Sequence, residues 1–209
     1  ERDLSEQYLL YCNTDGWDCG GGWWAHDYHV SKMPPGETEA GSVIEANFPY
    51  RAQAVSCGGP YSHYCKIDGW YFVGGGLSIP PVDAIKQAIT DHGPVAVAIC
   101  VGDMFQAYTG GVFDYSEEDS CGGGINHAVT LVGWYDEGPG SGYWILKNSW
   151  GAGWGEGGYM RIAYGTSNVG YSANYVEFSG NCSQLCSYSV TPEAELFGPA
   201  SGKGTFFVQ

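Results

Sequence analysis

Positive charge is scarce in this sequence. Lys and Arg number 8 against 23 Asp and Glu, so the formal net charge at pH 7 is −15. A field of that sign repels nucleic acid, and no cluster of basic residues offsets it. We therefore expect no nucleic-acid partner.

Long apolar runs are missing as well. Runs such as 95–101 are far too short to cross a bilayer, which takes about 20 residues, so we expect no membrane span. Hydrophobic residues nevertheless make up 44% of the 209 residues and charged residues only 15%, a composition typical of a protein with a packed core. The length fits one sizeable domain, or one domain with an appendage.

The sequence has 8 cysteines but no Cys-x-x-Cys pair, and Cys182 and Cys186 have no second pair at their spacing. Disulfides in an oxidising compartment are therefore favoured over a metal site. We expect an extracellular or secreted protein with no cofactor and no metal. The acidic stretch 114–119 could hold calcium, but a solvated loop is the expectation.

The residue pattern predicts an α+β fold, with a helical front half and a β-rich back half. Ser5 can cap an opening helix, a second helix is expected at 23–30, and Pro80–Pro81 and Gly93 bound a third. Residues 47–76 have no sustained period and predict an extended loop. Strands, each β-branched or aromatic, are expected at 95–101, 128–134, 143–147, 159–164 and 175–178.

Two short segments carry the candidate chemistry. His127 precedes the expected strand 128–134, and Asn148 follows the expected strand 143–147. A His and an Asn at neighbouring strand ends can meet, which suits a base held in one tautomer by an amide acceptor. Taken singly, His127 would be a structural histidine and Asn148 a turn residue, so only the combination is informative.

Several motifs, in order and in spacing, resemble papain-like cysteine peptidases from residue 1 to about residue 178. The resemblance implies a papain-like two-lobed fold, with a helical left domain and a β-barrel-like right domain. It also implies a cysteine-type endopeptidase with a Cys-His-Asn mechanism. The motifs are Leu4-Ser5-Glu6-Gln7, Cys19-Gly20-Gly21-Gly22, Phe48-Pro49-Tyr50, Gly93-Pro94-Val95, Phe105-x-x-Tyr108-x-x-Gly111, Asn126-His127-Ala128 and Lys147-Asn148-Ser149-Trp150-Gly151-Ala152-Gly153-Trp154-Gly155.

The resemblance assigns roles to individual residues. His127 would be the general base and acid partner of a cysteine thiolate, and Asn148 would accept a hydrogen bond from the far ring nitrogen of His127. Trp150 would shield that bond from water, and Trp154 would form the leaving-group side of the cleft. A peptide or protein substrate and a monomeric protein are expected. The implied substrate-binding positions are Gly21, Gly22, Trp23, Ala98 and Ala128.

The nucleophilic cysteine of the family is not found in this sequence. Relatives carry it in a Cys-Gly-Ser-Cys-Trp context roughly 130–150 residues before the His and Asn, and no such string occurs here. Cys12 and Cys19 match structural positions instead. We therefore expect a fragment, incomplete at the N-terminus, that lacks the Cys and the oxyanion Gln and is inactive as given. The alternative is a catalytically inactive papain-like binding module of a secreted modular protein.

The resemblance also implies disulfide pairings. Cys12 would pair with Cys57. Cys121 occupies a half-cystine position whose usual partner is absent, and Cys100 is the plausible replacement partner. Cys182 and Cys186 could bridge each other, whereas Cys19 and Cys65 have no assigned partner within the chain.

Three regions follow from the same resemblance. Residues 1–76 would be the remainder of the helical left lobe, 77–179 the β-rich right lobe with the catalytic His and Asn, and 180–209 a C-terminal extension. The extension resembles the first strands of bacterial BACON-type β-sandwich modules, with a disordered extension as the alternative. A bacterial, modular protein, secreted or on the cell surface, is the corresponding expectation.

Overall fold

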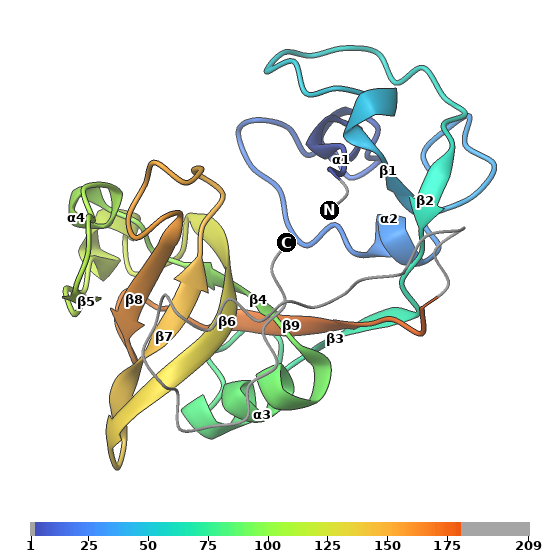
Figure 1. The fold of residues 1–209 in the computed structure, drawn as a ribbon. Helices are drawn as coiled ribbons and strands as arrows, with labels where there is room; N and C mark the ends of the chain where they lie inside the picture. Colours follow the sequence, from blue (N-terminus) through green and yellow to red (C-terminus); the bar gives the residue numbers. More distant parts are fainter. Residues whose placement is uncertain (1–2, 181–209) are drawn as a thin grey trace. The chain divides into compact units, whose positions relative to one another are not determined.

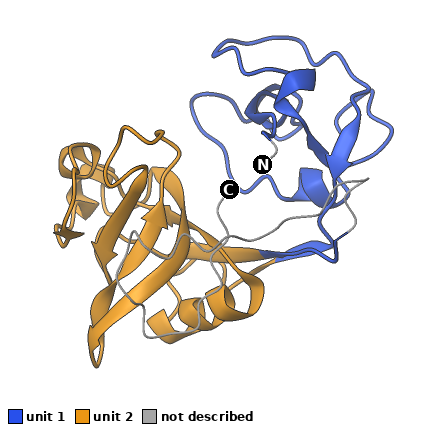
Figure 2. Ribbon diagram, viewed as in Figure 1, with its two compact units in different colours: residues 1–70, 176–189 blue, residues 71–175, 190–209 orange. Residues whose placement is uncertain are grey.

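The computed structural model describes residues 3–180. The expected extension with its BACON-type resemblance, and the expected bridge between Cys182 and Cys186, lie outside the described residues. Within that range the chain forms two compact units, unit 1 with residues 3–70 and 176–180, and unit 2 with residues 71–175 (Figure 2).

Unit 1 begins with helix α1 (Glu6–Tyr11), which starts where the sequence predicts (Figure 1). Ser5 Oγ accepts a hydrogen bond from the backbone N–H of Tyr8 at 3.0 Å and donates to the carbonyl of Phe48 at 2.6 Å. One hydroxyl therefore caps the helix and ties it to the loop that follows η1 (Glu45–Asn47). The small core of the unit consists of Tyr8, Cys12, Val43 and Phe48.

Two expectations for unit 1 are wrong. The expected helix 23–30 is reduced to α2 (Asp27–Val30), because the aromatic residues before it make ring contacts instead, such as Trp24 stacked on His26. The expected loop 47–76 contains β2 (His63–Cys65) and β3 (Gly69–Phe72). Strand β2 pairs antiparallel with β1 (Ser42–Val43), and such short strands with distant partners leave no periodic signal in the sequence.

The main sheet has the strand order β3-β9-β4-β6-β7-β8-β5. Strand β5 pairs parallel with β8, whereas β4 pairs antiparallel with β6 and β9, and β7 pairs antiparallel with β6 and β8. The expected strands all exist with shifted ends. Their bounds are β4 (Val95–Ile99), β6 (His127–Gly138), β7 (Ser141–Lys147), β8 (Tyr159–Ala163) and β9 (Tyr171–Glu177). The short strand β5 (Val112–Phe113) was not expected.

Helix α3 (Val82–His92) packs on β4 and β6, beside the sheet in Figure 1. It begins directly after Pro81 and ends at Gly93, whose φ of 90° favours glycine. The helix buries Ile85, Ala88 and Ile89. His92 is exposed, and its ring stacks on Tyr175 with centroids 3.8 Å apart.

The core of unit 2 lies against the β4, β6 and β7 strands, whose inward side chains such as Val97, Leu131 and Leu146 are fully buried. Within residues 3–180, no helix has the length and apolar character needed to cross a membrane.

Candidate active site

His127 and Asn148 meet at one edge of the main sheet. His127 is the first residue of β6, where it lies opposite Ile99 of β4, and Asn148 directly follows β7. Because β6 and β7 are antiparallel, the start of one and the end of the other lie at the same edge. The Nε2 atom of His127 is 2.9 Å from the Oδ1 atom of Asn148.

The surroundings of Asn148 determine which ring nitrogen of His127 carries the hydrogen. The backbone N–H of Ser149 donates to Asn148 Oδ1 at 2.8 Å, so the acceptor atom must be the amide oxygen. His127 Nε2 is therefore the donor in its bond with Asn148, and in the neutral ring the lone pair is on Nδ1. Asn148 is only 6% exposed, and its backbone N–H donates to the carbonyl of Gly158 at 2.9 Å, which anchors the backbone that carries the side-chain amide.

An aromatic cluster surrounds this pair. The ring of Trp150 lies 5.1 Å from that of His127, and Trp154 meets Trp150 edge-on at 5.3 Å. The ring of Phe105, from α4 (Asp103–Gln106), stacks on Trp154 at 5.3 Å and contacts Trp150 edge-on at 5.8 Å. Trp150 remains 40% exposed, so its shielding of the His–Asn bond is partial in unit 2.

Polar groups of neighbouring residues hold Trp154 in place. Its Nε1–H donates to the carbonyl of Gln106 at 3.1 Å, and its ring lies 5.7 Å from that of Tyr108. The Tyr108 hydroxyl donates to Glu156 Oε2 at 2.9 Å, and Arg161 Nε donates to the same oxygen at 3.0 Å. Arg161 holds the pKa of the Glu156 carboxyl below its usual range, and burial raises the pKa of Tyr108 to about 12. Both groups therefore keep one charge state around neutral pH.

The five expected substrate-binding positions fall into two groups. Gly21, Gly22 and Trp23 are exposed in unit 1, where Trp23 is 41% exposed. Ala98 and Ala128 are cross-strand partners of β4 and β6 in unit 2, the first buried and the second exposed. Their role in binding a substrate stays a prediction.

The structure contains the disulfide Cys12–Cys57, which the resemblance implies, and the disulfide Cys100–Cys121, in which Cys100 is the expected replacement for the absent family partner. Cys65 is also a half-cystine, whereas Cys19 is free and exposed. Cys19 is thus the one thiol found between residues 3 and 180. The same part of the chain has no group of three or more His, Cys, Asp or Glu arranged to hold a metal ion.

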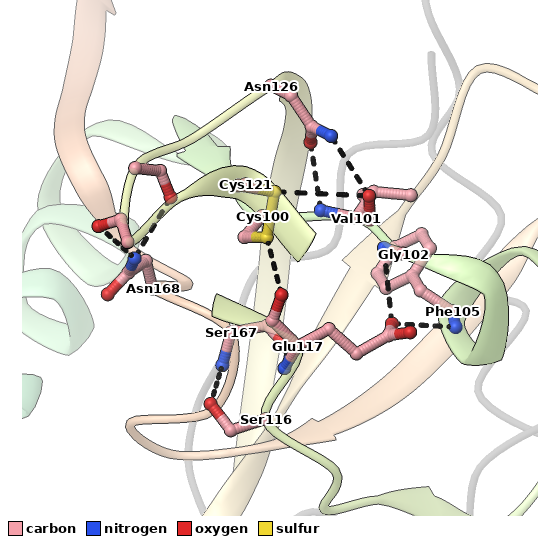
Figure 3. The surroundings of a disulfide bond; sticks show 12 residues. Cys100, Val101, Gly102, Phe105, Ser116, Glu117, Cys121, Asn126, Ser167 and Asn168 are labelled. Atoms are coloured by element: carbon pink, nitrogen blue, oxygen red, sulfur yellow. Dashed lines mark hydrogen bonds between the residues drawn. A yellow bond between two sulfur atoms is a disulfide. The ribbon is translucent and has the colours of Figure 1, made fainter. Parts of the chain in front are cut away.

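Sequence reasoning assigned no role to Asn126, which stood in a quoted motif, or to Glu117, which stood in the acidic stretch 114–119. The Asn126 side chain accepts from the N–H of Val101 at 2.8 Å and donates to the carbonyl of Val101 at 2.9 Å, which anchors the residue before His127 (Figure 3). Glu117 contacts residues 12–15 positions away, so no local pattern signals it. Phe105 stood in the quoted motif Phe105-x-x-Tyr108-x-x-Gly111, and that motif could have indicated that its ring belongs to the His127 site.

Comparison with known proteins identifies the class. Residues 1–178 match the family described as "Papain family cysteine protease", so the chain belongs to this family. The bromelain protease from Ananas comosus, solved with an inhibitor, superposes with a TM-score of 0.66 at 30% identity, covering 85% of this chain and 79% of that one. The α+β, papain-like fold expected from the sequence is thereby confirmed.

Curated relatives include fruit bromelain from Ananas comosus, 36% identical over 170 residues that cover 79% of this chain and 43% of the relative. The cysteine endopeptidase RepA from Oryza sativa subsp. japonica is 38% identical over 171 residues, covering 79% of this chain and 41% of that protein. The chain thus spans less than half the length of these relatives. Both come from plants, so these matches give no support to the bacterial type expected from the tail.

Proposed function

We propose that this chain supplies the base, its orienting amide and part of the cleft of a cysteine endopeptidase. We further propose that none of its own eight cysteines is the nucleophile. The observation that carries the proposal is the 2.9 Å contact between His127 Nε2 and Asn148 Oδ1, which leaves Nδ1 as the basic nitrogen. Membership of the papain family supports the same reaction class.

The proposed chemistry uses the His127 ring twice. Nδ1 takes the proton of a cysteine thiol, and the thiolate attacks the carbonyl carbon of the scissile peptide bond. The imidazolium then protonates the leaving amine, so that the C–N bond breaks and an acyl-enzyme remains. A water molecule, deprotonated by the same ring, hydrolyses the thioester and regenerates the thiol. Asn148 holds the ring in place throughout.

The state of the cysteines supports a thiol from elsewhere. Cys12, Cys57, Cys65, Cys100 and Cys121 are in disulfides and have no thiol to give. Cys19 is free but lies in a tight turn, the Asp18–Gly21 bridge, outside the sequence context in which the family places its nucleophile. The disulfides also support an oxidising, secretory destination, and we propose that the protein acts on peptides as a monomer without a cofactor.

The test compares the full-length protein that contains this chain with the 209-residue chain itself. We expect thiol-dependent cleavage of peptide substrates by the full-length protein and none by the chain. Cys19→Ser in the full-length protein should leave the cleavage rate unchanged. Turnover by the purified chain, or its loss on Cys19→Ser, would contradict the assignment of the thiol. A full-length protein that binds peptides without cleaving them would favour the inactive binding module.

A further inference from the structure

Helix α4 begins without a cap from its own first residues. Its N-cap is Gly102, which has no side chain to accept a hydrogen bond, and the carboxylate of Glu117 fills that role. Glu117 Oε1 accepts from the backbone N–H of Met104 at 2.8 Å, and Oε2 accepts from those of Phe105 at 2.9 Å and Gly102 at 3.2 Å. Figure 3 shows the side chain reaching Gly102 and Phe105.

Glu117 is itself held in place from several sides. Its backbone N–H donates to Ser167 Oγ at 3.1 Å, and that hydroxyl donates to the carbonyl of Tyr115 at 3.1 Å. Four residues further on, the Cys100–Cys121 disulfide joins η2 (Glu118–Cys121) to the end of β4. A Cβ atom on Gly102 would come within 2.5 Å of Glu117 Oε1. The carboxylate can therefore lie this close only because residue 102 has no side chain.

The capped turn carries Phe105, which is fully buried and packs against both Trp150 and Trp154. Its ring is also 6.5 Å from that of His127. Because Glu117 binds the backbone N–H of Phe105 and of the residue before it, the carboxylate fixes where this ring sits. An ionised carboxylate suits three N–H donors at a helix start better than a neutral group does.

We infer that Glu117 is a positioning residue, acting through Phe105, for the Trp150–Trp154 side of the His127 site. The inference rests on the proposed function in one respect, that this side receives the leaving-group part of a peptide substrate. Glu117 itself does not touch the reacting atoms. Its effect should therefore appear as altered placement of the aromatic rings and altered use of extended substrates.

The first test is spectroscopic and needs no catalysis. In the 209-residue chain, Glu117→Gln should shift the indole N–H resonances of Trp150 and Trp154 and the ring resonances of His127. Glu118→Gln, the same change of charge one residue further on, should leave them in place. Unchanged resonances in Glu117→Gln would overturn the inference.

Gly102→Ala provides a second variant, in case Glu117→Gln does not fold. The added methyl group displaces the Glu117 carboxylate without changing any charge, so it should shift the same indole and imidazole resonances. If Gly102→Ala folds and those resonances stay where they are in the unsubstituted chain, Glu117 does not position the cluster.

The second test is kinetic and uses the full-length protein. Glu117→Gln should lower kcat/KM roughly tenfold for peptides extended beyond the scissile bond, and clearly less for substrates that end in a small amide leaving group. Equal losses on both substrates would mean a merely structural role. If the full-length protein cleaves neither substrate, the proposed function fails while the resonances still decide the role of Glu117.

Discussion

At the scale of single residues, the site depends on one amide oxygen that accepts from both His127 and Ser149. In the full-length protein, His127→Ala should lower kcat about 10²–10⁴-fold, because the thiol loses its proton acceptor. Asn148→Ala should cost less, roughly tenfold, because it frees the ring without removing the base. Steady-state kinetics on variants with unchanged circular dichroism measures both. A larger loss for Asn148→Ala than for His127→Ala would reverse the two roles.

His29 in unit 1 is a buried histidine whose protonation should destabilise the fold. Burial, with the neighbouring His26 and His63, lowers its pKa to about 4 from the usual 6.5. As pH falls, the His29 ring takes up a proton in the unfolded chain before it does so in the folded chain. The stability that comes from burying the neutral ring is therefore fully present above about pH 6.5 and is lost as pH falls toward 4. The free energy of unfolding should drop by up to about 3 kcal/mol over that interval.

Urea denaturation of the chain at pH 7 and pH 4.5 measures this loss. His29→Gln removes the titrating ring, so the variant should show a smaller difference in stability between the two pH values. His92→Gln, which changes an exposed histidine, is the matched control and should keep the full difference. An equal pH dependence in His29→Gln and the unsubstituted chain would exclude His29 as its source.

At the scale of elements, the β6–β7 hairpin offers a paired test of backbone fit. A Cβ on Gly142 (φ 153°) would approach the carbonyl oxygen of Tyr135 to 2.1 Å, whereas one on Gly138 meets nothing within 4 Å. Gly142→Ala should therefore lower the free energy of unfolding by roughly 2–4 kcal/mol, and Gly138→Ala by less than about 0.5 kcal/mol. Thermal and urea denaturation would measure this difference in the free energy of unfolding. Similar stabilities for the two variants would contradict the hairpin register.

Elements were predictable where the sequence contains its own boundaries. Pro81 and Gly93 bound α3, Ser5 caps α1, β-branched residues mark β4, and aromatic residues mark β7. Prediction failed where the structure depends on distant partners. Strands β2 and β3 pair with segments far along the chain, and the residues before α2 form ring contacts that no helical pattern foretells.

The site shows the same division. His127 and Asn148 could be named from the sequence because each stands beside a strand end in a specific motif. The role of Glu117 could not be predicted from the sequence. Its hydrogen bonds to α4 depend on a loop that the Cys100–Cys121 disulfide and Ser167 bring close to that helix.

At the scale of the whole molecule, the proposed catalytic groups have two sources. In the proposed function this chain supplies the base and the amide from unit 2, and its described cysteines, apart from Cys19, are in disulfides. The central claim is that His127 activates a thiol that is none of the eight in this sequence.

The most direct measurement is to label the full-length protein with a thiol-reactive, substrate-like epoxide and to locate the modified residue by peptide mass spectrometry. We expect one rapidly modified cysteine outside these 209 residues, with labelling that slows strongly in His127→Ala. Rapid labelling of Cys19, or labelling that is indifferent to His127→Ala, would contradict the central claim.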